Sequence, residues 1–183
     1  MTHPKMRTLI LLSFLLLTLS VSAQQTIDHS DTLLKVSKER YSLGYPKSWT
    51  IDTSKQLGAD LFIFSQKESD TDKFRENVNV MIQDLKGFNI NLDKFIEISE
   101  EQIKTMLTNA NIIESKRMNN GNIEFHKLIF SGVQGIFNLK TEQYYFQFNE
   151  KGFVITLTTE QNKFGNYKEI GETILKSFKL KEE

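Results

Sequence analysis

The sequence predicts an α+β fold, in which a central antiparallel sheet is covered by other layers on both faces. The run LFIF at residues 61–64 is apolar at both parities, whereas a strand with one wet face alternates between apolar and polar residues. In the second half of the chain, tight-turn signals separate four strand-like runs, which is typical of an antiparallel meander. These turn signals lie at residues 120–121, 131–135 and 149–152. Two amphipathic segments supply the helices.

The first half of the chain is expected to contain short strands and one helix. Residues 33–45 are strand-like, and Pro46 ends the run because proline cannot donate to a ladder. Residues 78–82 alternate, which predicts a strand with one fully apolar face. Residues 92–107 repeat apolar side chains at three- and four-residue steps, which predicts a helix, and Asn91 is expected to cap it.

The second half is expected to hold the meander and a closing helix. The four strands of the meander are predicted at residues 112–118, 123–131, 136–148 and 153–159. Asn166, with Glu169 three residues later, is similar to a capping box and predicts the start of the last helix. The chain has no internal repeat and no linker, so residues 33–183 are expected to form a single domain.

Composition excludes several classes of function. The 183 residues include 23 basic and 23 acidic side chains, so no basic excess points to nucleic acid. The chain has no cysteine, which excludes disulfides, zinc–thiolate sites and a thiol nucleophile. No glycine-rich phosphate loop and no Gly-x-Ser-x-Gly nucleophile motif occurs, and no cofactor is expected.

The N-terminal segment is typical of an export signal. Lys5 and Arg7 precede an apolar run at residues 8–21, and small residues follow up to Ala23. Because the run is shorter than the ~20 residues of a spanning helix, we expect cleavage after Ala23 and no stable membrane span afterwards. Residues 1–23 are thus predicted to be a signal peptide, and the polar residues 24–32 a flexible leader.

Three motifs resemble PsbP-like domains. YSLGYPKSW at residues 41–49 resembles their opening strand, and FRENVNVMIQDL at residues 74–85 resembles the strand before their first helix. YKEIGETILKSFKL at residues 167–180 resembles their closing helix. The resemblance implies an α/β/α sandwich, with helices on both faces of an antiparallel sheet. The family includes extrinsic subunits of photosystem II, a Ran-binding nuclear protein and bacterial envelope proteins, so it shares a fold and no common catalytic motif.

The acidic residues Asp70, Asp72 and Glu76 allow two interpretations. Oxygen ligands from a loop suit hard cations, but the glycine and the distal glutamate of an EF-hand loop are missing. The favoured interpretation is therefore a solvated loop between two strands, with the cation site as the alternative.

Two further groups of residues are candidates for chemistry or recognition. Glu124 and His126 share one parity of a strand and could pair as an orienting group and a base, although an ordinary polar position is the favoured interpretation. In the strand TEQYYFQF, Tyr144, Phe146 and Phe148 are assigned to the core. The alternate row of Thr141, Gln143, Tyr145 and Gln147 is assigned to an exposed or partly covered face, with Tyr145, Gln143 and Gln147 as a recognition surface.

The sequence favours an exported, non-catalytic domain of the bacterial cell envelope that binds another envelope protein. The first alternative is a carrier of a small ligand or lipid, with a cavity between sheet and helix. The second is a hydrolase that uses Glu124 and His126, which would require a serine close to the histidine.

Overall fold

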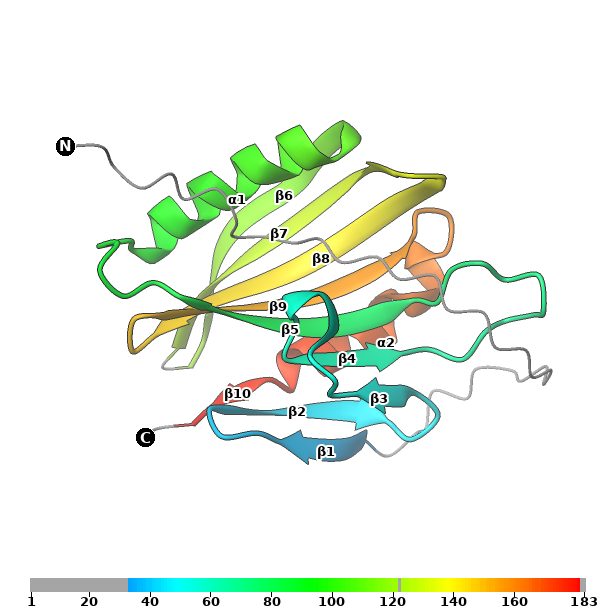
Figure 1. Cartoon of the computed structure of the whole chain (residues 1–183), viewed down its shortest axis with the longest axis horizontal. Coiled ribbons are helices and arrows are strands. Elements are labelled where there is room, and N and C mark those ends of the chain that lie inside the picture. The colour runs from blue at the N-terminus through cyan, green and yellow to red at the C-terminus, as the bar shows by residue number, and fades with distance from the viewer. Residues whose placement is uncertain (1–32, 122, 182–183) are drawn as a thin grey trace.

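The computed structural model describes residues 33–121 and 123–181. The predicted signal peptide and leader, residues 1–32, lie outside these residues. The chain forms two antiparallel sheets and two α-helices (Figure 1). The predicted α+β class with an antiparallel sheet is therefore confirmed.

The smaller sheet has three strands in the order β1-β2-β10, and the larger sheet has seven strands in the order β3-β4-β5-β9-β8-β7-β6. The smaller sheet consists of β1 (Leu33–Ser37), β2 (Tyr41–Pro46) and β10 (Lys179–Leu180). The larger sheet consists of β3 (Thr50–Asp52), β4 (Leu61–Phe64), β5 (Asn77–Asp84), β6 (Thr108–Asn120), β7 (Ile123–Gln134), β8 (Phe137–Phe148) and β9 (Lys151–Glu160). Strands β6 to β9 form the predicted meander, and β9 returns to pair with β5.

The first helix, α1 (Leu92–Met106), follows the prediction closely. The side chain of Asn91 accepts a hydrogen bond from the backbone N–H of Lys94 at 2.9 Å, which satisfies one of the unpaired donors of the first turn. Among the described residues, no helix has both the length and the apolar character needed to cross a membrane.

The second helix, α2 (Phe164–Lys176), begins earlier than predicted. Lys163 occupies the cap position without a side-chain cap hydrogen bond, so the expected start at Asn166 is wrong. The reason is tertiary: Lys163 is engaged by carboxylates from the loop between β4 and β5, which holds the start of the helix in place without a local cap.

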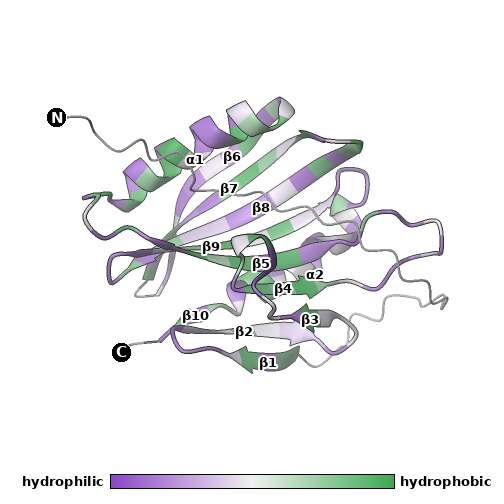
Figure 2. Ribbon diagram, in the orientation of Figure 1, coloured by the Kyte–Doolittle hydropathy of each residue, from purple (hydrophilic) through white to green (hydrophobic). Residues whose placement is uncertain are grey.

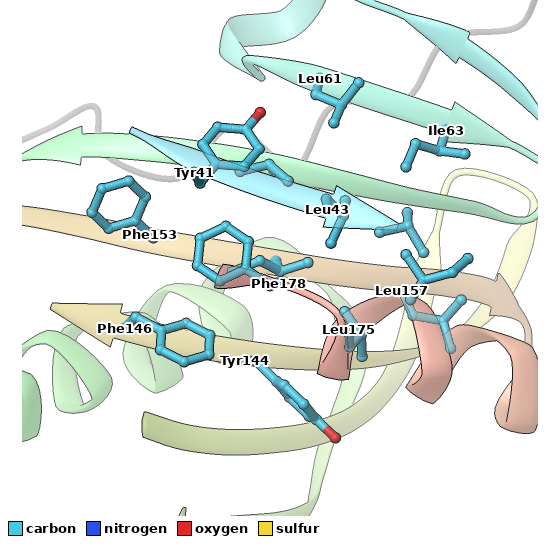
Figure 3. Close-up of a cluster of buried hydrophobic side chains, with 14 of the residues drawn as sticks. Tyr41, Leu43, Leu61, Ile63, Tyr144, Phe146, Phe153, Leu157, Leu175 and Phe178 are labelled. Atoms are coloured by element: carbon cyan, nitrogen blue, oxygen red, sulfur yellow. The ribbon is translucent and has the colours of Figure 1, made fainter. Parts of the chain in front are cut away.

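Two apolar clusters pack against alternate residues of the large sheet. In β9, Phe153, Ile155 and Leu157 belong to the cluster that includes α2 and β2, whereas Val154 belongs to the cluster that includes α1. Because neighbouring residues of a strand point to opposite faces, the two clusters lie on opposite sides of β9. Figure 3 shows the first cluster, in which the rings of Tyr41 and Phe178 stack with centroids 5.4 Å apart.

Candidate functional site

The acidic loop between β4 and β5 is closed around a lysine. Lys163 Nζ lies 3.1 Å from Glu68 and 3.4 Å from Asp72 on this loop, and 3.8 Å from Glu76. Glu160 completes the group at 2.9 Å. These five residues are called the Lys163 cluster. The loop extends beyond the end of the sheet, beside the connection from β9 to α2 (Figure 1).

The loop interpretation of the sequence is wrong for two of its three acids. Glu76 is 0 % exposed, and the side chain of Asp72 is 4 % exposed. Asp72 accepts hydrogen bonds from the backbone N–H groups of Glu68 and Phe74, and the hydroxyl of Tyr167 donates to Glu68 at 2.9 Å. The segment is thus anchored over the start of α2, because Asp72 and Glu76 lie against Lys163 instead of in solvent.

The charges of the Lys163 cluster are unbalanced, since four carboxylates surround one ammonium group. Burial raises the pKa of Glu76 to about 7, and the nearby charge of Lys163 offsets this only in part. Burial alone would lower the pKa of Lys163, but hydrogen bonds to Glu160 and Glu68 raise it. Within the described residues, no group of acidic or histidine side chains is arranged to hold a metal ion. Lys163 occupies the place beside Asp72 and Glu76 where the alternative interpretation expected a bound cation.

A second lysine joins strand β6, strand β8 and helix α2. Lys127 Nζ lies 3.2 Å from Glu142, 3.7 Å from Glu114 and 3.8 Å from Glu172. Glu142 is 0 % exposed, and burial raises its pKa although the charge of Lys127 opposes the rise. An ion pair of this kind ties the elements together, because removal of either partner leaves a buried charge uncompensated.

The structure brings His126 to a serine, but in an arrangement in which the histidine does not accept the serine proton. Ser115 Oγ lies 2.8 Å from His126 Nε2 and donates to Glu100 at 2.6 Å. A hydroxyl has one proton, so the donation to Glu100 requires His126 Nε2 to be the donor in the other bond. A nitrogen that already holds a proton cannot take one from serine. His126 Nδ1 is buried and has no partner among the described residues, so no group orients the ring as in a catalytic triad.

Glu124 contacts Arg117 instead of its predicted partner His126. Its carboxylate lies 3.7 Å from Arg117 Nη1, and Arg117 also contacts Asp93 of α1. Burial and the charge of Arg117 lower the pKa of His126, which favours the neutral ring. The polar residues between α1 and strands β6 and β7 therefore hold the helix on the sheet.

The predicted recognition surface is not an exposed face. Tyr145 is 0 % exposed and Gln143 is 2 % exposed, while Gln147 is half-buried. The ring of Tyr145 packs edge-on against Phe95 of α1, and its hydroxyl donates to Gln143 at 2.5 Å. Gln147 donates to the backbone carbonyl of Ile90 at 2.6 Å. The expectation is wrong because α1 covers this row of β8, and the polar side chains satisfy one another beneath it.

Strand β6 forms one edge of the large sheet. In the described part of the chain it pairs with β7 alone. Its first half contains two register irregularities, and pairing is regular from Glu114 to Asn120. Helix α1 lies along this edge, where Asp93 contacts Arg117 and Glu100 accepts from Ser115 (Figure 1). Sequence reasoning missed this edge, because the strand order of a sheet with a returning β9 is not visible in the alternation of residues.

The arrangement of strands and helices is shared with known structures. No family model matches the sequence, and no curated protein matches it either. A solution structure of cyanobacterial PsbP (CyanoP) from Synechocystis sp. PCC 6803 is similar with a TM-score of 0.64. The alignment covers 88 % of this chain and 99 % of CyanoP, at 15 % identity.

The chain has a PsbP-like fold.

Two further structures share this PsbP-like fold. LpqN of Mycobacterium tuberculosis, described as involved in cell envelope biogenesis, has a TM-score of 0.57 at 11 % identity, over 88 % of this chain and 100 % of LpqN. PA94 of Pseudomonas aeruginosa, a protein of unknown function and putative regulator by its description, has a TM-score of 0.57 at 10 % identity, over 79 % of this chain and 94 % of PA94. The resemblance drawn from the three sequence motifs is therefore confirmed at the level of the fold.

Proposed function

We propose that this protein is an exported, non-catalytic accessory domain that binds another protein of the bacterial cell envelope. The observation that carries the proposal is the PsbP-like fold shared with LpqN, which is involved in cell envelope biogenesis. The order of charged, apolar and small residues at positions 5–23 supports export. The finer arrangement that we assign to the fold is the α/β/α sandwich, with α1 and α2 on opposite faces of the large sheet.

The hydrogen bonds and ion pairs of the candidate reactive side chains support a binding role over a catalytic one. Ser115 donates its proton to Glu100 and not to His126, so the serine–histidine pair that the predicted hydrolase would need is not formed. Lys127 and Lys163 are half-buried and surrounded by carboxylates, which raise the pKa values of both lysines and keep them protonated. A protonated ammonium is neither a base nor a nucleophile.

Close packing beneath α1 favours the binding domain over a ligand carrier. A Cβ atom at Gly152 would lie 2.5 Å from the ring of Phe95, and one at Gly132 would lie 2.9 Å from Leu107. The first turns of α1 therefore rest directly on β9, and Leu107, which follows the helix, rests directly on β7. A carrier would need a gap between sheet and helix to hold its ligand, and these close contacts argue against such a gap.

Chemical crosslinking in the native host tests the proposal. The full chain with a C-terminal tag should form a reproducible adduct with one protein of the cell envelope. The control lacks residues 1–23 and is expected to form no such adduct, because it stays in the cytoplasm. Equal labelling of many proteins by both forms, or no adduct at all from the full chain, would contradict the proposed function.

A further inference from the structure

The edge of β6 has the properties of a docking site for an extended segment. Seven residues, Glu114 to Asn120, pair regularly with β7, and no other described strand takes up the opposite edge of β6. A strand of that length extends over roughly 20 Å. Its outward backbone groups form a row of donors and acceptors that an added strand can pair with.

Natural edge strands are often protected by bulges, and β6 has them in only one half. The register shifts lie between Thr108 and Asn111 and between Ile112 and Glu114. Ile113, at the second irregularity, is 48 % exposed. Bulges interrupt pairing in the first half of the strand, so an added strand is directed to the half from Glu114 onward.

Helix α1 borders this edge with an acidic stripe. Asp93, Glu97 and Glu100 follow at steps of four and three residues, which places them along one side of the helix. Asp93 contacts Arg117 and Glu100 accepts from Ser115, so this side faces β6. The side chain of Asp93 is 81 % exposed and that of Glu97 is 56 % exposed. Hydrophilic and hydrophobic residues alternate along α1, as expected for an amphipathic helix (Figure 2).

Basic side chains near the acidic stripe weaken its attraction for a basic ligand. Lys94 pairs with Glu97 at 2.6 Å, and Lys104 continues the stripe toward the end of α1. Glu100 makes no ion pair among the described residues. Its carboxylate accepts a hydrogen bond from Ser115 and can accept others, because an ionised carboxylate is only an acceptor. Asp93 is also paired, with Arg117, so Glu100 is the carboxylate of the stripe that is left to attract a basic group, above the start of the regular half of β6.

We propose that an extended segment of another protein, with basic residues at alternate positions, adds to the β6 edge beneath the acidic stripe of α1. The proposal rests on the proposed protein-binding function and names its surface. Alternate residues of an added strand point to the same face, so its basic side chains would all meet α1. A second copy of this chain is disfavoured, because antiparallel pairing of two β6 edges would bring the two acidic stripes toward each other.

A defined peptide tests the docking site on the full chain. The probe is a synthetic peptide of about eight residues, in which lysine alternates with threonine, a good strand former. The matched peptide has glutamate in place of lysine. We expect the lysine peptide alone to bind and to slow amide hydrogen exchange in β6. No binding, or binding that leaves β6 exchange unchanged, would overturn the proposal.

Two sets of variants separate strand pairing from simple charge attraction. Glu97→Gln with Glu100→Gln should weaken peptide binding about fivefold to tenfold, as expected for two exposed charge contacts. The control, Glu101→Gln with Glu169→Gln, removes the same charge from exposed positions outside the stripe and should leave binding unchanged. Equal losses in both double variants would show a general charge effect and overturn the proposal.

A proline at the edge tests the backbone contact. Neighbouring residues of an edge strand direct their N–H groups alternately toward the paired strand and away from it. Only one of the two variants Lys116→Pro and Arg117→Pro therefore removes an outward N–H donor and leaves the hydrogen bonds to β7 intact. The variant that keeps the wild-type melting temperature is expected to lose peptide binding. Full binding by that variant would contradict strand addition. A native envelope partner crosslinked at another surface would refute this docking site alone, whereas the absence of any partner would refute the proposed function.

Discussion

At the scale of single residues, the burial of carboxylates around lysine sets how stability depends on pH. Glu76 has a folded-state pKa of about 7, above the ordinary value of 4.5, and desolvation is the main cause. Between these two pH values the folded chain holds a proton that the unfolded chain has released. Stability from this group is therefore complete below the lower value and is lost as pH rises through about 7.

We therefore expect Glu76→Gln to raise stability at pH 8 and to change it little at pH 5. The amide keeps the shape of the side chain and removes a buried charge, so the gain at alkaline pH should be about 1–3 kcal/mol. Chemical denaturation of both proteins at each pH measures the difference. Glu142, which shifts in the same direction, remains in the variant and leaves a residual slope. A variant that loses stability at both pH values would show that the charge of Glu76 is needed.

Asp70 and Asp72 should respond differently to the same substitution. Asp72 accepts two backbone hydrogen bonds and lies 3.4 Å from Lys163, whereas Asp70 is exposed. Asp72→Asn is expected to cost about 1–2 kcal/mol, and Asp70→Asn less than about 0.5 kcal/mol. Thermal unfolding of the two variants makes the comparison. Equal and small effects would restore the solvated-loop interpretation.

Tyr145 is expected to be a core residue on the evidence of its packing against Phe95. Tyr145→Ala should cost about 3–5 kcal/mol, as much as Phe146→Ala, because both rings are buried. Tyr145→Phe keeps the ring and loses the hydroxyl that donates to Gln143, so a cost of about 1 kcal/mol is expected. Urea denaturation of the three variants tests the assignment. If Tyr145→Ala were nearly neutral, α1 could not cover this row.

At the scale of elements, the sequence predicts strands well where local turns define them. The Asn-Gly turn at residues 120–121 lies where the structure has a connection. The turn predicted at residues 149–152 is shorter than expected, because only Asn149 and Glu150 connect the strands and Gly152 lies within β9. Helix α1 is also predictable, because Asn91 supplies a local cap. By contrast, the start of α2 depends on Lys163 and the distant loop, so local capping signals misplace it.

The faces of β8 could not be predicted from alternation alone. Polar residues at Thr141, Gln143 and Gln147 suggest a wet face, yet Gln143 bonds to Thr156 of the neighbouring strand and to Tyr145. A sheet covered on both sides can bury a polar row when its members satisfy each other. In β4, which the doubly apolar LFIF run predicts to be covered on both faces, Leu61, Phe62 and Ile63 are buried.

The contact of α2 with the large sheet depends on a glycine. A Cβ atom at Gly171 would lie 2.3 Å from Leu157 Cδ2, whereas one at Gly165 would meet nothing within 4 Å. Gly171→Ala is therefore expected to cost about 1–3 kcal/mol through overpacking. Gly165→Ala, in the same helix, should be neutral or stabilising by up to about 1 kcal/mol. Equal effects in denaturation experiments would mean that α2 does not rest on β9 at Gly171.

At the scale of the whole molecule, the PsbP-like fold supplies a rigid support for one exposed edge. The ion pairs of Lys127 and Lys163 fix α2 and the loop between β4 and β5, while α1 is fixed by apolar packing. These contacts order the large sheet, whose strand β6 remains unpaired on one side within the described chain. A preformed edge lowers the entropic cost of binding, because only the partner segment must be ordered.

Site-specific photocrosslinking in the native host tests the central claim most directly. A photoreactive amino acid at position 116 on β6 should form an adduct with one envelope protein. The same group at position 169 on α2 should form none, since that residue lies on another exposed surface. The adduct from position 116 should also decline when Glu97 and Glu100 are both replaced by glutamine. An adduct from position 169 alone, or from neither position, would contradict the account.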